Sequence, residues 1–397
     1  MIAALGTAQT IAWASTYYLP AILAVPMARD LGVSAPTVFA AFSVALLVSA
    51  VLGPVAGRAI DRWGGRPVLI STNLIFAAGL LALSVANSTA ELFAAWIVLG
   101  IGMGSGLYEA AFSALVRLYG AAARSSITGI TLIAGFASTV GWPLSTVLEA
   151  EFGWRGACLV WAGIHLFLGI PLNALVAHMS RSPNRVDSEP VPEEKGDAAG
   201  PRVPRRSAIL LAFVFACTWF ISTAMAAHLP QLLQASGATL AAAVTAGALI
   251  GPAQVGARML EYGLLRRFHP LLTARAATLM HPLGVAVITV FGAPAAAAFA
   301  VLHGAGNGIM TIANGTLPLA LFGSVGYGRR QGLLMVPARM VQAFAPWLFG
   351  LCLYRWGAGA LWVSASVGLA ASAALFLLAR IGTADSTNSN APTSTTP

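Results

Sequence analysis

Charged and titratable residues that stand alone in long apolar stretches are the groups of this sequence that could do chemistry. Glu109 is the single charged residue of the stretch 92–116, and Arg339 lies in the middle of another such stretch. His228 lies in a third. A charge in hydrocarbon costs roughly 2.5–3.5 kcal/mol on insertion scales, so such residues face a protein interior and have a partner or a task. We predict that Glu109 and His228 carry protons and that Arg339 binds an anion. A purely structural role, as hydrogen-bonded or ion-paired groups, stays open.

Uncharged polar side chains accompany these charges. Tyr18, Tyr108, Asn307 and Asn314 lie in apolar stretches and are expected to line the same polar interior. Periodicity alone does not separate such lining from hydrogen bonding between helices. We therefore predict a binding site made of these four residues and Arg339.

A short charged loop separates two apolar stretches. It reads Gly57-Arg58-Ala59-Ile60-Asp61-Arg62-Trp63-Gly64-Gly65-Arg66. Gly57 is expected to allow close approach of helices, as small residues do in membranes. Asp61 can pair with an arginine or cap the positive end of a neighbouring helix, and Arg62 and Arg66 can bind lipid phosphates. The alternative is a solvated basic loop that sets topology alone.

Arg258 and Glu261 form a second charged pair, three residues apart and so on one helix face. They could bind substrate or protons. The interpretation that we favour is a counterpart of Arg58-x-x-Asp61, about 200 residues later in an internal repeat.

The composition is that of a membrane protein. Charged residues make up 9% and hydrophobic residues 58% of the 397 residues, whereas soluble domains have about 25% charged residues. A spanning helix needs roughly 20 apolar residues. The sequence predicts an all-α membrane protein with twelve transmembrane helices at 3–27, 37–57, 67–86, 90–117, 125–148, 155–178, 207–234, 239–264, 271–292, 294–322, 331–354 and 357–380.

The net charge of +9 follows this topology. With the first residue inside, only Arg29, Arg155 and Arg355 of the basic residues in this arrangement fall outside, which is the positive-inside bias. We therefore expect both termini in the cytoplasm, contact with membrane lipids, and no nucleic-acid partner.

Metal, disulfide and cofactor sites are not predicted. Cys158, Cys217 and Cys352 lie in apolar segments without paired spacing. No HExxH, GxSxG or Walker sequence indicates an enzyme.

The chain divides into two similar halves. Residues 181–206 are polar and lack apolar periodicity, so we expect a cytoplasmic linker between a six-helix bundle at 1–180 and another at 207–381. Residues 382–397 are expected to be a disordered tail. The halves share motifs in the same order, and among these Gly102-x-Gly104-x-Gly106 matches Gly304-x-Gly306-x-Gly308.

The loop at 57–66, the six-plus-six repeat and the central linker resemble the major facilitator superfamily, over residues 1–381. The stretch Arg124–Thr139 also resembles, faintly, an arsenite-efflux branch. The resemblance implies alternating access, a gating role for the charged loop at 57–66, and a multi-pass protein of the bacterial cytoplasmic (inner) membrane. The gating residues that it implies are Gly57, Asp61, Arg62, Gly64, Arg66, Arg258 and Glu261.

We therefore expect a monomeric secondary transporter of a small solute, coupled to protons, with efflux favoured over uptake. The alternatives are an uptake carrier for an organic anion or other small metabolite, and a membrane sensor of the same fold that does not transport.

Overall fold

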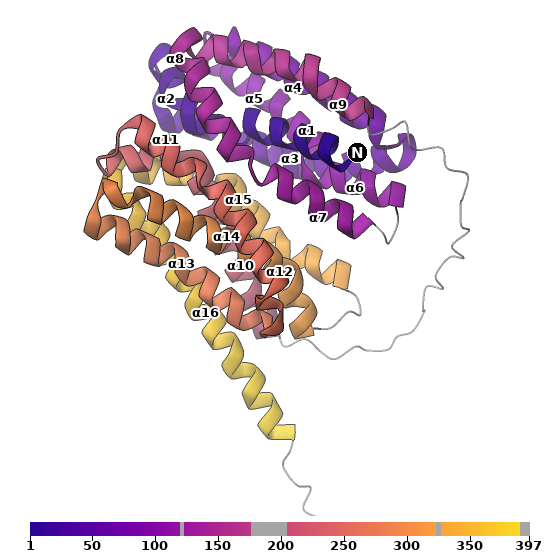
Figure 1. Cartoon of the computed structure of the whole chain (residues 1–397), viewed down its shortest axis with the longest axis vertical. Coiled ribbons are helices and arrows are strands. Elements are labelled where there is room, and N and C mark those ends of the chain that lie inside the picture. The colour runs from indigo at the N-terminus through magenta and orange to yellow at the C-terminus, as the bar shows by residue number, and fades with distance from the viewer. Residues whose placement is uncertain (120–122, 176–204, 323–326, 390–397) are drawn as a thin grey trace, which may run out of the picture.

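The computed structural model describes residues 1–119, 123–175, 205–322 and 327–389, and the described part contains helices and no strands (Figure 1). The side chains of Asp61 and Glu109 lie outside this description. The elements of the first half are α1 (Ile2–Ser15), α2 (Pro20–Asp30), α3 (Ala35–Trp63), α4 (Gly65–Ser84), α5 (Thr89–Gly106), α6 (Tyr108–Tyr119), α7 (Ala123–Ala134), α8 (Ala137–Ile164), a π-helical turn (His165–Gly169) and α9 (Ile170–Leu175). The elements of the second half are α10 (Arg205–Ala235), α11 (Leu240–Ala248), α12 (Ile250–Gly263), α13 (Pro270–Phe291), α14 (Ala296–Phe322), α15 (Tyr327–Trp356) and α16 (Ala360–Ser389).

Ten helical segments of the described chain are long and apolar enough to cross a membrane. Two of them, Gly129–Leu175 and Leu333–Leu378, have 47 and 46 residues, far more than the roughly 20 that one crossing needs. Each contains a glycine with positive φ, at 67° for Gly153 and 53° for Gly357. Such a residue is outside the right-handed helical region, so the chain changes direction there.

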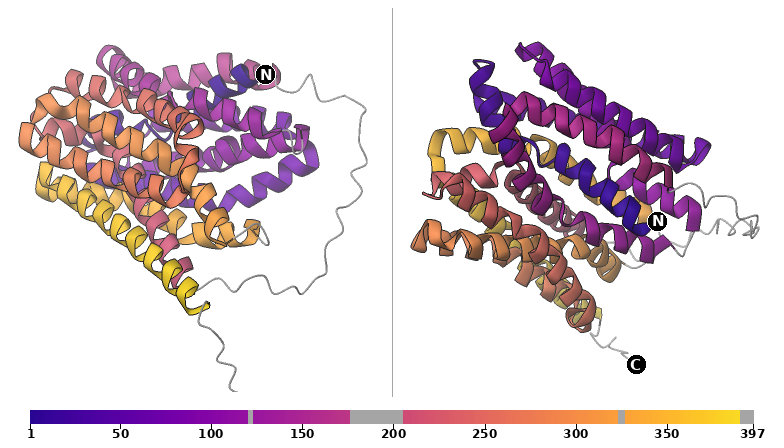
Figure 2. Two further views of the ribbon diagram at one scale, coloured as in Figure 1. Left: turned by 60° about the horizontal axis from the view of Figure 1, so that its bottom comes forward. Right: turned by 45° about the horizontal axis from the view of Figure 1, so that its top comes forward.

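The two halves of the chain lie beside each other. In Figure 1, α1 to α9 occupy the upper part and α10 to α16 the lower part, and the right-hand view of Figure 2 shows the same arrangement. The contacts between them run mainly along four pairs of helices: α3 with α15, α8 with α11, α8 with α12, and α2 with α10.

Four helices that the sequence predicts as continuous are interrupted. Pro20 begins α2 and has no N–H to continue the preceding helix, and glycines, which are weak helix formers, lie at two other breaks. The predicted helices 3–27, 90–117, 125–148 and 239–264 break at Thr16–Leu19, Leu107, Gly135–Phe136 and Leu249 respectively.

Side chains of other helices bond backbone carbonyls that lie at these breaks. A carbonyl without a helical partner is costly in a membrane interior, where no bulk water replaces the bond. The bonds are Gln9 Nε2 to the Gly106 carbonyl (2.7 Å), Trp142 Nε1 to the Tyr18 carbonyl (3.2 Å) and Thr139 Oγ1 to the Ala248 carbonyl (2.7 Å). The breaks are therefore built into the packing of the helices.

Glycines let the helices of each half approach closely. A Cβ atom at Gly100 would lie 2.6 Å from the Ala45 carbonyl oxygen of α3, and one at Gly308 would lie 2.6 Å from the Gln254 carbonyl oxygen of α12. Gly104 likewise faces α3, and Gly304 faces α12. By their contacts, Gly100 and Gly104 therefore correspond to Gly304 and Gly308. The sequence-based pairing of Gly102 with Gly304 is displaced by two residues.

The charged loop differs in part from its prediction. Nothing lies within 4 Å of a Cβ atom built at Gly57, so close approach is not the reason for this glycine. The close contact is made by Gly65, whose added Cβ would collide with Ala114 of α6. Gly64 has φ 92° and makes the turn between α3 and α4. Arg117 Nη1 donates to the Ile60 carbonyl at 2.6 Å and so caps the last turn of α3.

We predict that Gly100→Ala destabilises the protein by about 1–3 kcal/mol, because its Cβ would meet backbone atoms of α3. Gly53→Ala is the matched control, since the same atom at Gly53 of α3 meets nothing within 4 Å. Thermal unfolding of the two purified variants measures the difference. Equal unfolding temperatures would show that α3 and α5 are less tightly packed than described.

Candidate functional site

A cavity of about 130 Å³ lies where the broken helices meet. Tyr17 and Tyr18 come from the break between α1 and α2, Tyr108 begins α6 directly after Leu107, and Gly135 lies at the break between α7 and α8. Irregular backbone at membrane depth is tolerated where it is buried in protein or lines a cavity. The breaks and the cavity are thus parts of one arrangement.

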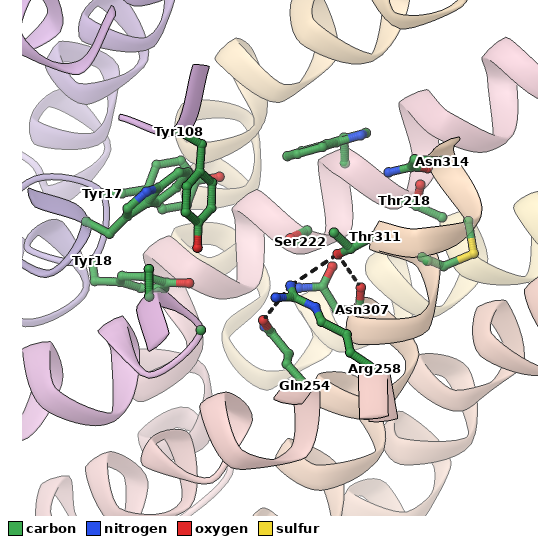
Figure 3. A pocket seen from close by; sticks show the side chains of 15 residues that line it. Tyr17, Tyr18, Tyr108, Thr218, Ser222, Gln254, Arg258, Asn307, Thr311 and Asn314 are labelled. Atoms are coloured by element: carbon green, nitrogen blue, oxygen red, sulfur yellow. Dashed lines mark hydrogen bonds between the residues drawn. The ribbon is translucent and has the colours of Figure 1, made fainter. Parts of the chain in front are cut away.

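Aromatic side chains form one wall of the cavity. The ring centroids of Trp13 lie 4.9 Å from those of both Tyr17 and Tyr108, and those of Tyr17 and Tyr18 are 5.6 Å apart. Figure 3 shows the hydroxyl groups of Tyr18 and Tyr108 pointing toward the opposite wall, where Arg258 lies. This wall offers apolar surface and two hydroxyl groups.

Arg258 of α12 supplies the positive charge of the cavity. Its Nη1 donates to the Thr131 carbonyl at 3.2 Å, and its Nη2 donates to Gln254 Oε1 and Thr311 Oγ1, both at 3.4 Å (Figure 3). These bonds are at the long end of the range for hydrogen bonds. Its Nε atom is buried and has no hydrogen-bond partner among the described residues. The guanidinium group therefore has capacity for a further acceptor.

No described carboxylate neutralises this guanidinium group. The ion pair found in the described part of the chain joins Arg155 to Asp30, at the other end of the first half. A cation in a partly desolvated cavity attracts anions more strongly than one in water. Arg258 offers a planar fork of donors that suits the two oxygens of a carboxylate. The arrangement can bind a small oxyanion.

The structure does not show the expected pairing of Arg258 with Glu261. Arg258 points into the cavity, whereas Glu261 Oε1 accepts a hydrogen bond from Thr273 Oγ1 of α13 at 3.4 Å. Glu261 is buried, with 8% of its surface exposed. The two side chains lie three residues apart, but each finds a nearer partner on another element.

Four of the five predicted binding residues line the cavity, namely Tyr18, Tyr108, Asn307 and Asn314. Arg339 of α15 does not. It lines a separate cavity of about 60 Å³ between α3 and α15, together with Ser49 and Gln342. Trp13 and Tyr17 border both cavities, so the two arginines lie on different sides of the aromatic wall.

His228 lies away from both cavities. Its Nε2 bonds the Pro346 carbonyl at 2.7 Å, and its ring packs on Phe39 of α3 with centroids 3.8 Å apart. The side chain thus joins α10, α15 and α3. Its predicted proton-carrying role has no geometric support from the cavity.

Of the predicted gating residues in the loop, Arg62 and Arg66 are exposed, and the Arg62 guanidinium lies 5.6 Å from the centroid of the Trp63 ring. The side chains of Asp61 and Glu109 are outside the described part of the chain, so their predicted partners are not placed here.

Sequence reasoning assigned Arg258 to gating and gave no role to Gln254, Thr218 or Ser222, which also line the cavity. One signal was available. Gln254 and Arg258 are four residues apart and therefore share a helix face, and a polar face in an apolar stretch points to a polar interior. A cluster of three or more His, Cys, Asp or Glu side chains suited to a metal is absent from the described residues.

Comparison with known proteins identifies a family whose model matches most of the chain. A family model described as Major Facilitator Superfamily matches residues 5–328. The fold is similar to that of a nucleoside transporter, NupG, with a TM-score of 0.75, 12% identity, and coverage of 95% of this chain and 98% of that one. It is also similar to a bacterial homologue of the human lysosomal transporter Spinster in an inward-facing, occupied conformation, with a TM-score of 0.70, 14% identity, and 96% of each chain covered.

Curated relatives match over a shorter stretch. Monocarboxylate transporter 1 of Rattus norvegicus is 30% identical over 127 residues, which is 31% of this chain and 25% of the relative. Monocarboxylate transporter 11 of Mus musculus is 31% identical over 144 residues, which is 35% of this chain and 31% of the relative. The matches thus span between a quarter and a third of those proteins' length.

A buried hydrogen bond of the cavity residue Tyr17 joins the two halves. Tyr17 Oη and Thr223 Oγ1 are 2.7 Å apart, and Gln342 Nε2 donates to Tyr17 Oη at 3.3 Å. We predict that Tyr17→Phe and Thr223→Val are non-additive, with a coupling energy of about 0.6 kcal/mol, as is usual for such bonds in membranes. Denaturant unfolding of the two single variants and the double variant measures this energy. Strictly additive effects would contradict the bond.

Proposed function

Because the chain belongs to the major facilitator superfamily, we propose that it carries small organic monoanions across a membrane, with Arg258 as the group that binds the anion. The family and its solved neighbours indicate a multi-pass transporter rather than an enzyme. The observation that carries the proposal is the Arg258 guanidinium, which faces the central cavity without a described carboxylate partner.

The size and lining of the cavity support a small anion. At about 130 Å³ it is smaller than the roughly 300–1,000 Å³ of sites for drug-sized ligands. The oxygens of a carboxylate would face Arg258 and the hydroxyl groups of Tyr18 and Tyr108, and its carbon part would contact the Trp13 ring. The names of the monocarboxylate transporters that match part of the chain agree with this class of substrate.

Anion binding would act on the contact between the two halves. Arg258 Nη1 bonds the Thr131 carbonyl at the end of α7, and this bond joins α12 to the first half. An anion bound at Nε, which has no partner among the described residues, would draw the same guanidinium group away from that carbonyl. Occupancy of the cavity would therefore weaken one bond between the halves, and ligands shift a conformational equilibrium by such differences in binding.

The remaining parts of the proposal come from the sequence. Twelve crossings in two six-helix bundles would rock about the cavity, the loop at 57–66 would gate this motion through Asp61 and Arg62, and both termini would be cytoplasmic in a bacterial inner membrane. Protons are the proposed coupling ion. The anion and proton gradients would set the direction, so efflux and uptake would be modes of one carrier.

We predict that Arg258→Gln abolishes uptake of L-lactate, pyruvate and acetate into proteoliposomes. Arg258→Lys keeps the charge but loses the planar fork, so its apparent affinity should fall about 10- to 100-fold, since hydrogen bonds to charged groups contribute about 1.5–3 kcal/mol. Uptake of the radiolabelled anions measures both effects.

Arg267→Gln is the control, because Arg267 is exposed after α12 and lines neither cavity. Arg339→Gln should weaken uptake much less than Arg258→Gln. If Arg339→Gln abolishes uptake and Arg258→Gln leaves it normal, the anion binds on the α3–α15 side and the proposal fails.

The proton-coupling role of Glu109 is tested separately. If Glu109 is the coupling group, as the sequence predicts, Glu109→Gln should lose accumulation driven by a pH gradient but retain exchange of labelled for unlabelled anion, because exchange needs no net proton movement. Glu91→Gln, at the exposed start of α5, is the control. Accumulation by Glu109→Gln with an unchanged pH profile would make this carboxyl group structural.

A further inference from the structure

Two buried histidines face each other beside the anion cavity. His281 of α13 and His303 of α14 are 5% and 4% exposed, and their Nδ1 atoms are 3.1 Å apart. The Phe299 ring stacks on the His303 ring with centroids 6.2 Å apart. The proposed function gives this pair no role.

The hydrogen bonding of the pair is incomplete. Between two neutral imidazoles one Nδ1 donates and the other accepts, so the two Nε2 atoms need other partners. His281 Nε2 is buried and has none among the described residues. His165 in the first half is the contrast, because Ser15 Oγ lies 2.7 Å from its Nε2 and Asn73 Oδ1 lies 2.9 Å from its Nδ1. Both ring nitrogens of His165 have partners, so a structural role accounts for this residue. The His281–His303 pair leaves a ring nitrogen without a partner among the described residues, so a structural role does not account for it.

Both histidines line a small cavity of about 30 Å³, which is enough for a water molecule. This cavity shares Thr218, Ser222, Asn307 and Met310 with the Arg258 cavity. The anion site and the histidine pair therefore lie on two sides of the same few side chains.

The surroundings of the pair are uncharged. The side chains that α10, α14 and α16 contribute to the small cavity carry no charge, and the α13 residues beside His281 there are Ala277 and Thr278. Arg275, two turns earlier on α13, bonds the Leu375 carbonyl. Arg258 is the cation across the shared wall. A proton on the pair is thus an uncompensated charge in the empty carrier, and such a charge is costly in the interior.

We propose that the His281–His303 pair is a proton-binding site that is loaded together with the anion. This inference rests on the proposed anion transport. One proton from water binds a ring nitrogen as the anion binds Arg258, so the loaded carrier has the same net charge as the empty one. The pair then holds one added proton across its Nδ1–Nδ1 hydrogen bond, and no covalent bond is made or broken. Each transport cycle moves one proton with one monoanion.

The test compares two modes of transport in proteoliposomes with radiolabelled L-lactate. We expect His281→Gln and His303→Gln to reduce accumulation driven by a pH gradient at least about tenfold, while exchange of labelled for unlabelled L-lactate stays within about twofold of the parent protein. The two effects together separate coupling from folding, since a misfolded variant loses both modes.

Thr278→Val is the matched control. Thr278 lines the same small cavity, and its Oγ1 lies 2.7 Å from Ser372 Oγ, but its hydroxyl group does not take up a proton near neutral pH. It should change both modes equally. If the histidine variants accumulate L-lactate like the parent protein, or if Glu109→Gln alone uncouples transport, the proposal is overturned.

A second measurement does not depend on transport. In protein labelled with 15N-histidine, addition of L-lactate at constant pH should protonate the pair, and the two ring signals that shift should be those lost in His281→Gln and His303→Gln. In Arg258→Gln the shift should be absent. If L-lactate binds and both rings stay neutral between about pH 5 and 8, the pair is not the proton site. If L-lactate neither binds nor moves, while acid still protonates the pair as one unit, the proposed substrate fails and the proton site stands.

Discussion

The structure depends on how backbone groups are bonded where its helices break. In a membrane interior a helix satisfies its own N–H and C=O groups, and a break leaves some of them in need of partners. Here the partners are side chains of neighbouring helices, and Gln9, Trp142 and Thr139 each bond a carbonyl at a break. Arg258 adds a second hydrogen bond to the Thr131 carbonyl in the last turn of α7, which already accepts one from the Gly135 N–H. Tyr17, Tyr18 and Gly135 lie at such breaks and Tyr108 directly follows one, and all four line the polar cavity.

Hydrogen bonds of this kind join the two halves, with donors on each half and acceptors on the other. Thr139 of the first half bonds the Ala248 carbonyl of the second, and Arg258 of the second half bonds the Thr131 carbonyl of the first. Polar pairs inside each half also resemble each other, since Asn73 contacts His165 in the first half and Thr278 contacts Ser372 in the second. The halves differ where the site lies. The first half supplies Trp13 and three tyrosines, and the second supplies Trp219, the arginine and the histidine pair.

The sequence predicted the all-helical class correctly because long apolar runs have few alternatives in structure. Its twelve crossings stay a prediction, since ten candidate spans are found in the described residues. The sequence assigned Tyr18, Tyr108, Asn307 and Asn314 to a binding site, and these side chains line the cavity, since polar side chains in apolar helices turn inward; their role in binding stays a prediction. It missed the helix breaks, which arise from bonds between residues as distant as Gln9 and Gly106. For the same reason it paired Arg258 with Glu261. Their spacing along one helix can be taken from the sequence, whereas their contacts with Thr131 and Thr273 on other helices cannot. It also gave Gly57 the packing role that Gly65 has.

Anion binding at Arg258 is the central claim about this protein. A crystal structure of the protein with 2-bromopropionate, a monocarboxylate that contains an anomalous scatterer, tests this claim directly. We expect bromine density inside the cavity of Trp13, Tyr18 and Tyr108, with the carboxylate oxygens about 3 Å from the Arg258 guanidinium. Density beside Arg339, between α3 and α15, with the Arg258 cavity unchanged, would contradict it.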